Sequence, residues 1–417
     1  MTQPAAPLRG DLHGPSGETR PARAPLVSRP LARVFASTFA ALTSFYLLLS
    51  VVPHYAATSG AGDIGAGLAT GALFFATTLT ELATPRLVAA FGGRFVFGAG
   101  LVLLGVPSLA LGVSTSLAAI ALICMLRGIG LASVVVVGSA LTASLVPPER
   151  RGEGLGLYGV VAGVPAVVAL PLGLWLAARF GYGPVFIAGA VTALAGLIVL
   201  PGPAAAQPEM EPAAGVLAAL RSPALLLPSV VFLLTAVAGG VVVTFVPLAA
   251  PAGWGSLAAV ALLLFAAAST LSRWWAGRSM DRHPTLDLLR PSVVCTGLGV
   301  VGLSFIDHRL ALLAAATLVG TGFGVAQNAS LTLMFVVVSR SEFESVSAIW
   351  NLAYDFGLGA GGALFGVIVT RTGYSAAFAL TGAVILAAQA AVWRSRHLVA
   401  RRSPSPGTRP GLVRSAS

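Results

Sequence analysis

Lysine is absent from this sequence of 417 residues, and charged residues of all kinds make up only 9% of it. A Walker A loop needs a lysine for the nucleotide phosphates, so the chain encodes no ATP-driven pump. The two cysteines, Cys124 and Cys295, form neither a CxxC motif nor a disulfide framework, which leaves no basis for thiol redox chemistry. No HExxH motif occurs, and no serine, histidine and acid stand out as a catalytic group. We therefore expect no enzyme, no cofactor and no metal site.

Apolar residues are what the sequence has in abundance. They form 56% of the chain, and the mean hydropathy of +0.90 lies far outside the range of soluble globular proteins. A bilayer core about 30 Å thick needs about 20 apolar residues per helix, and such runs recur along nearly the whole chain. We expect an all-α membrane protein with twelve transmembrane helices. Their predicted ranges are 31–56, 64–84, 95–115, 117–143, 156–178, 184–201, 225–249, 256–276, 292–306, 310–338, 345–370 and 376–393.

The 25 basic residues, all of them arginine, indicate the orientation of these helices. Arginine and lysine collect in cytoplasmic loops. With both termini in the cytoplasm, only Arg179, Arg309, Arg371 and the intramembrane Arg127 lie elsewhere. We therefore expect a multi-pass protein of the plasma membrane with cytoplasmic termini. The net charge of +11 reflects this bias and does not indicate nucleic-acid binding.

The chain divides into two related halves. A shift of 192 residues aligns "RFGYGPVF" from Arg179 with "RTGYSAAF" from Arg371, and it places Gly128 on Gly320. Because each half has an even number of spans, the repeats have the same orientation in the membrane. The predicted organisation is a disordered cytoplasmic tail (1–30), a six-helix bundle (31–201), a cytoplasmic linker (202–224), a second six-helix bundle (225–393) and a basic cytoplasmic tail (394–417).

Four stretches carry a family resemblance. After the second span of the second half, "GRSMDRH" supplies Gly277, Arg278, Asp281 and Arg282, whereas the first-half copy "PRLVAAFGGR" retains only its end, including Arg94. The others are "LRGIGLA" around Arg127, "QNASLTLMF", and "SAIWNLAYDFGLGAGG". On these stretches residues 31–393 resemble the major facilitator superfamily, most of all its twelve-helix drug/proton antiporters and arabinose-efflux-permease-like proteins. The resemblance implies two parallel six-helix repeats that alternate in access, with the "GRSMDRH" loop as part of a gate. The antiporter pattern of the fifth helix is present only in pieces.

Intramembrane polar residues carry what function there is, because a charge near the bilayer centre costs about 2.5 to 3.5 kcal/mol even on lenient scales. Asp355 lies about 15 Å deep in the predicted eleventh helix, and Asn351 shares its face one turn earlier. Arg127 lies at a similar depth in the fourth helix. We expect Asp355 to be the proton-responsive carboxylate and Arg127 to compete with the proton for it. The alternative is a purely structural role for each, including a permanent pair.

Two further residues are candidates for proton coupling. Glu81 lies on the second helix nearer the cytoplasm, where a gating ion pair explains it at least as well as proton coupling does. His54 lies near the outer surface, where a solvated histidine explains it better than proton coupling does. In the superfamily fold the second helix packs beside the eleventh and the fifth beside the eighth. Glu81 is then positioned to meet Arg340, and Arg273 to meet Glu153, as gating pairs.

The remaining candidates for the substrate cavity are Tyr46 and Ser50 on the first helix and Gln327 and Asn328 on the tenth. Gln327 and Asn328 suit substrate binding and helix association equally well. A mostly apolar cavity with isolated polar groups suits a hydrophobic drug or metabolite. We therefore expect a monomeric exporter whose partners are a small molecule, protons and the lipid bilayer. A proton-coupled importer, a non-transporting receptor and a membrane-embedded enzyme are the alternatives.

Overall fold

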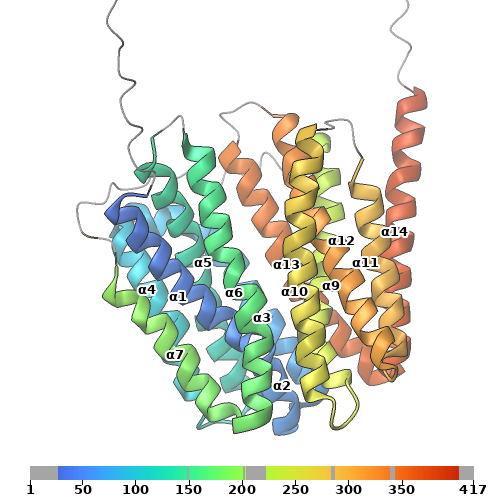
Figure 1. Ribbon diagram of the computed structural model, residues 1–417, viewed down its shortest axis with the longest axis horizontal. Coiled ribbons are helices and arrows are strands. Elements are labelled where there is room, and N and C mark those ends of the chain that lie inside the picture. The colour runs from blue at the N-terminus through green and yellow to red at the C-terminus, as the bar shows by residue number, and fades with distance from the viewer. Residues whose placement is uncertain are drawn as a thin grey trace, which may run out of the picture.

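The computed structural model describes residues 27–147, 150–200, 202, 222–282, 287–338 and 343–402, and every regular element in these ranges is helical (Figure 1). The first half contains α1 (Arg29–Leu49), α2 (Val51–Ala56), the π-helical turn η1 (Ala57–Ala61), α3 (Gly62–Phe91), α4 (Gly93–Ala110), α5 (Leu117–Leu145), α6 (Arg151–Phe180) and α7 (Tyr182–Ile198). The second half contains α9 (Pro223–Ala249), α10 (Gly255–Arg282), α11 (Leu289–Gly302), η3 (Leu303–Phe305), α12 (Arg309–Val336), α13 (Phe343–Thr372) and α14 (Tyr374–Arg402).

The helices have the length and composition of membrane spans. Among the described residues, eight stretches are long and apolar enough to cross a bilayer, and three shorter apolar helices accompany them. The first stretch, Arg29–Phe91, contains two predicted spans, and its backbone leaves the helical conformation at Gly60 with φ of 105°. Each predicted range falls largely on one helix, or on two consecutive ones for the first and the ninth. That twelve of them cross the membrane stays a prediction.

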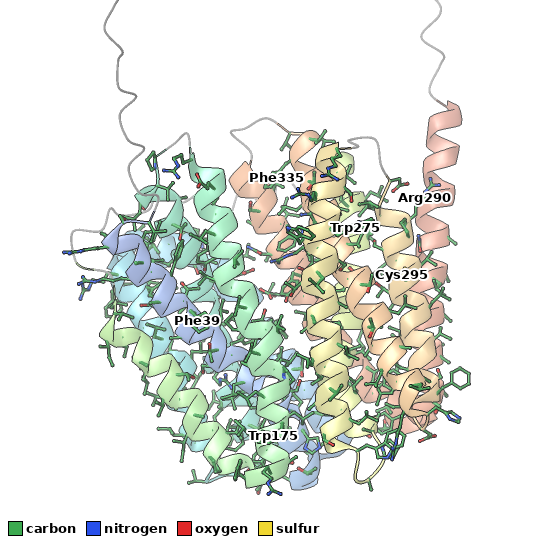
Figure 2. All side chains as sticks on the ribbon, viewed as in Figure 1. Phe39, Trp175, Trp275, Arg290, Cys295 and Phe335 are labelled. Atoms are coloured by element: carbon green, nitrogen blue, oxygen red, sulfur yellow. The ribbon has the colours of Figure 1, made fainter. Side chains whose placement is uncertain are left out.

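The outer surface of the helix bundle is apolar, as a lipid environment favours. Apolar side chains cover it, among them Phe39 on α1, Trp175 on α6 and Trp275 on α10 (Figure 2), which are 43%, 46% and 51% exposed. The helical elements and this apolar surface confirm the expectation of an all-α membrane protein.

Glycines end helices at equivalent points of the two halves. Gly181 after α6 and Gly373 after α13 have φ of 81° and 75°, and their amides donate to Ala177 and Val369. Glycine adopts this left-handed conformation without strain and so caps a helix. Under the shift of 192 residues Gly181 falls on Gly373, so the shared "RxGY" motif is a helix ending followed by a helix start.

The halves also pack internally in the same way. A side chain at Gly128 would collide with the carbonyl oxygen of Leu73, and one at Gly320 would collide with that of Phe265. Leu73 and Phe265 are themselves 192 residues apart, so α5 lies on α3 as α12 lies on α10. This equivalence confirms the predicted repeat.

The two halves lie side by side and meet along two seams, α3 against α13 and α6 against α10. α1 begins and α14 ends at the same end of the bundle (Figure 1). We call this end the terminal side and the other the opposite side. α14 continues to Arg402, so the predicted basic tail from 394 begins as helix, and α1 likewise begins just within the predicted N-terminal tail. Most of the predicted tails and of the linker lies outside the described residues.

Candidate functional site

Two carboxyl groups meet at the seam between α3 and α13. Glu81 lies about 15 Å from the terminal-side end of α3, and Asp355 lies about 18 Å from that of α13, so the two are level. Their side chains lie close enough for each carboxyl group to affect the other, and Asp355 is only 6% exposed. Oε2 of Glu81 is buried and has no hydrogen-bond partner among the described residues. A carboxylate only accepts hydrogen bonds. A direct hydrogen bond between these two carboxyl groups would therefore require that one of them carries a proton.

Small residues bring this pair together. A side chain at Gly67 of α3 would meet the carbonyl oxygen of Gly362, and one at Gly71 would meet Ala363 on α13. Small residues of this kind let membrane helices approach to backbone contact. Glu81 follows Gly67 and Gly71 on the same helix face, and Asp355 precedes Gly359 of α13 by one turn. The close packing of the seam thus continues into the acid pair.

A second polar cluster lies beside the acids. The hydroxyl of Tyr46 of α1 lies near that of Tyr354 of α13, so these two side chains meet between the two halves. Arg273 of α10 donates to the side-chain oxygen of Gln327 at 3.3 Å and interacts electrostatically with both tyrosines. Tyr46 also interacts electrostatically with Asp355. Arg273 and Asp355 therefore both lie near the two tyrosines at the centre of the molecule.

The two seams carry these groups at equivalent positions of the repeat. Glu81 corresponds to Arg273, and Asp355 corresponds to Gly163 of α6. A Cβ at Gly163 would lie 3.5 Å from Nη2 of Arg273. One seam thus joins two acids, and the other places an arginine against a glycine.

Stacked aromatic rings support the second half of the site. Trp350 stacks on Phe232 with ring centroids 4.6 Å apart, and it lies nearly parallel to Tyr354 at 8°. Trp350 also donates its ring N–H to Ser330 at 3.0 Å. Phe323 of α12 stacks on Tyr354 from another side. Sequence reasoning missed Tyr354, although its place next to Asp355 and one turn from Trp350 was an available signal.

Arg127 does not reach Asp355, so the predicted competition between them is not found. Arg127 is 1% exposed and its Nη2 donates to the carbonyl oxygen of Ser44 at 3.3 Å. Gly128 lies directly against Leu73 of α3, while Arg127 beside it faces α1 of its own half. Within the described residues, Nε of Arg127 and the hydroxyl of Ser44 have no hydrogen-bond partner.

Several other predicted residues take structural positions. Ser50 is fully buried and donates to Val243 at 2.6 Å, so it joins α1 to α9 and does not line a cavity. Nδ1 of His54 lies 2.7 Å from the hydroxyl of Tyr182 within the first half, near the opposite side.

The remaining amides differ in their surroundings. The side-chain oxygen of Asn328 accepts from Thr332, and its nitrogen would lie 3.0 Å from a Cβ at Gly277, so Asn328 faces α10. Asn351 is partly buried one turn from Asp355, and among the described residues its amide has no hydrogen-bond partner. Of the four predicted amide and hydroxyl groups on α1 and α12, Tyr46 and Gln327 belong to the central cluster.

Of the two predicted gating pairs, Arg273 with Glu153 is not formed among the described residues, and Glu81 with Arg340 stays a prediction. Glu153 binds Arg150 at 2.8 Å, three residues away and on the surface, whereas Arg273 binds Gln327. Glu81 meets Asp355, and its predicted partner Arg340 lies outside the described residues.

The "GRSMDRH" motif is helical as far as Arg282, so it forms the last turns of α10 and not a loop. The guanidinium of Arg278 lies 5.7 Å over the ring of Trp274. Arg282 and Arg94 are exposed, and the side chain of Asp281 lies outside what the structure describes. Its gating role stays a prediction.

Apolar helices in two repeats, with a polar centre between them, define a membrane transport protein. The chain belongs to the Major Facilitator Superfamily, whose family model matches residues 34–361. The fold and the family indicate a transporter and not an enzyme.

Solved structures share the fold. The nucleoside transporter NupG matches with a TM-score of 0.71 and 12% identity over 88% of this chain and 99% of its own. A bacterial homologue of the human lysosomal transporter Spinster, inward-facing and occupied, matches at 0.70 and 15% over 90% and 98%. The peptide transporter POT with alafosfalin matches at 0.69 and 16% over 89% and 95%. Since these identities are low, the likeness establishes the fold alone, and the drug/proton antiporter group stays a prediction.

Proposed function

We propose that this protein is a secondary active transporter of the plasma membrane, with cytoplasmic termini, that exports a small and largely apolar organic molecule in exchange for protons. The two halves alternate in access around the central site, as parallel repeats of this superfamily do. The support for an apolar cargo is the surroundings of the site, where stacked aromatic rings outnumber the charged groups.

The observation that carries the proposal is the Glu81–Asp355 pair. Each half contributes one of the two carboxyl groups. While one proton is shared, the pair attracts the two halves to each other. When that proton leaves, two like charges at hydrogen-bonding distance repel. Proton occupancy and the separation of the halves are then linked, and this differential affinity of the access states for a proton is all that coupling requires.

Arg273 has a different role in this proposal. Its contact with Gln327 is long, at 3.3 Å, and no acid among the described residues is paired with it. Among the described residues it is the cation that interacts with both central tyrosines. We assign it to the polar part of the cargo and to balancing the charge of the ionised pair.

The experiment compares inverted and right-side-out vesicles, with ethidium and berberine as lipophilic probes. In both kinds of vesicle, the membrane face that is extracellular in the cell is exposed to the more acidic solution. Inverted vesicles with an acidic lumen should concentrate a probe when they contain the wild-type protein. Asp355→Asn and Glu81→Gln should lose this uphill accumulation yet keep downhill exchange. A protease-accessible C-terminal tag, exposed on inverted vesicles, checks the orientation in the same samples.

Asp307→Asn is the matched control, since Asp307 is an exposed acid between η3 and α12, and it should transport like the wild type. Accumulation at the wild-type level by Asp355→Asn would show that proton coupling lies elsewhere, for example at His54. Accumulation in right-side-out vesicles alone would make the protein an importer.

A further inference from the structure

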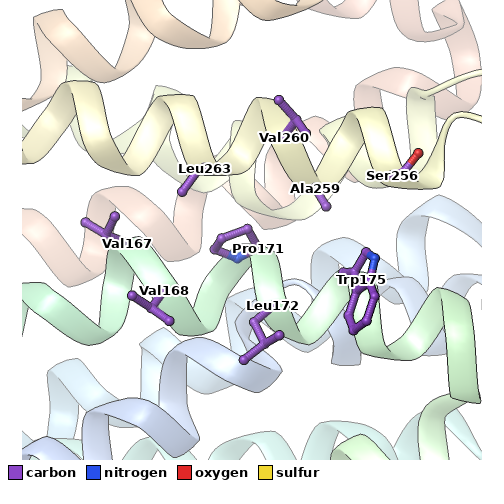
Figure 3. A pocket seen from close by; sticks show the side chains of 9 residues that line it. All are labelled: Val167, Val168, Pro171, Leu172, Trp175, Ser256, Ala259, Val260 and Leu263. Carbon is purple, nitrogen blue, oxygen red and sulfur yellow. The ribbon is translucent and has the colours of Figure 1, made fainter.

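An apolar groove of about 520 Å³ lies between α6 and α10, the second seam of the molecule. Figure 3 shows Pro171 and Leu263 directed into the space between the two helices. The lining residues are Val167, Val168, Pro171, Leu172, Trp175, Ser256, Ala259, Val260 and Leu263. Apart from the Ser256 hydroxyl and the Trp175 ring nitrogen, none of these side chains offers a hydrogen-bonding group.

The groove is open along one side, and α6 and α10 approach each other beyond its lining residues at both ends. Towards the terminal side, Arg273 lies against Gly163, and towards the opposite side, Gly255 lies against Ala178. The side chains of Val168, Leu172 and Val260 are 57%, 40% and 42% exposed. Because these helices have the composition of membrane spans, the open side faces the hydrocarbon of the bilayer.

The repeat explains why this seam has a groove and the other does not. Four of the lining positions correspond to the residues that close the α3–α13 seam. Ala259 corresponds to Gly67, Leu263 to Gly71, Val167 to Gly359 and Pro171 to Ala363. Where α3 and α13 touch through glycines, α6 and α10 are held apart by larger side chains. The same scaffold thus forms one closed seam and one that leaves apolar space.

We propose that one acyl chain of a membrane phospholipid occupies this groove, in the leaflet of the opposite side. An apolar space left empty loses the dispersion contacts of its walls, and hydrocarbon chains are the molecules that surround it. Both polar lining groups support the orientation. Ser256 is the second residue of α10 and Trp175 lies near the end of α6, so both sit at the level of the opposite-side headgroups. The acyl chain fills the space between α6 and α10, which corresponds to the place where glycines bring α3 and α13 into direct contact.

The experiment uses the full-length protein in phosphatidylcholine vesicles that contain a small fraction of phosphatidylcholine with a diazirine in the middle of one chain. After illumination, lipid adducts are mapped along the sequence by mass spectrometry. Adducts on Val167, Ala259 and Leu263 should exceed those on Val191 severalfold, although Val191 of α7 is 59% exposed and Ala259 only 5%. The equivalent glycines of α3 and α13 should yield almost none.

Ala259→Phe fills the groove and should reduce groove adducts at least fivefold while adducts at Val191 stay unchanged. Val191→Phe makes a bulkier side chain on the lipid face and should leave the groove adducts as they are. If Ala259→Phe fails to fold, Leu263→Phe takes its place in the test, since it fills the same space and should likewise reduce the groove adducts. Groove adducts no more frequent than those on α7, or retained in the filled variants, would overturn the proposal.

Loss of groove adducts on adding ethidium, with no change at Val191, would assign the groove to a lipophilic solute and would also overturn it. The labelling needs neither transport nor a proton gradient, so its outcome is independent of the proposed transport function.

Discussion

Single charged residues in a membrane must be neutralised or paired, because the bilayer penalises each uncompensated charge. In the proposed mechanism, Glu81 and Asp355 satisfy this condition through a shared proton. Arg127 does not, since its described contacts are the carbonyl of Ser44 and the neighbouring Cys124, and no acid is among them. We expect such a cation to cost stability and to serve in transport.

Replacing Arg127 by methionine removes the charge and keeps an unbranched side chain of similar reach. We expect Arg127→Met to raise the apparent melting temperature in detergent, equivalent to about 1 to 3 kcal/mol, and to abolish transport. Arg86→Met, at an exposed position of α3, should leave both unchanged. A lower melting temperature for Arg127→Met would mean that the guanidinium has a stabilising partner in the fold.

The elements of the fold depend on glycine at specific helix contacts. Gly128 and Gly320 each lie directly against a backbone carbonyl of the neighbouring helix, whereas Gly156 of α6 has no atom within 4 Å of its Cβ position. These environments predict opposite effects of the same substitution.

Gly128→Ala and Gly320→Ala should each lower the stability of the protein by about 1 to 3 kcal/mol, because α5 or α12 must move away from its neighbour. Gly156→Ala should be neutral or stabilise by up to about 1 kcal/mol, since alanine is the better helix former. Thermal unfolding of the three variants in the same detergent makes the comparison. Equal effects in all three would contradict the described helix contacts.

The sequence predicts the helices and the repeat well because both follow from local properties. Apolar length defines a span, and "RxGY" marks the same helix ending in both halves. The contacts of the site depend on the rotation of each helix about its axis, which hydropathy does not determine when a helix is apolar all round. The sequence therefore identifies Asp355 as a rare intramembrane acid but pairs it with Arg127, whereas in the structure Arg127 binds Ser44 and the acid near Asp355 is Glu81.

On the scale of the whole molecule, two seams join the same two halves with different chemistry. The α3–α13 seam combines backbone contact with the acid pair, and hydroxyl groups add to it, since Thr70 and Thr244 lie 2.9 Å apart between α3 and α9. The α6–α10 seam holds Arg273 and the apolar groove. In the proposed transport cycle, the proton on the acid pair decides when the first seam loosens.

The shared proton is the central claim, and infrared spectroscopy of the purified protein in lipid nanodiscs tests it directly. The wild-type protein should show the carbonyl stretch of a protonated carboxyl group, shifted by deuterium exchange and titrating as a single group. Glu81→Gln and Asp355→Asn should each remove this band, whereas Asp307→Asn should retain it. A wild-type spectrum without the band, or a band that persists in both single variants, would contradict the account.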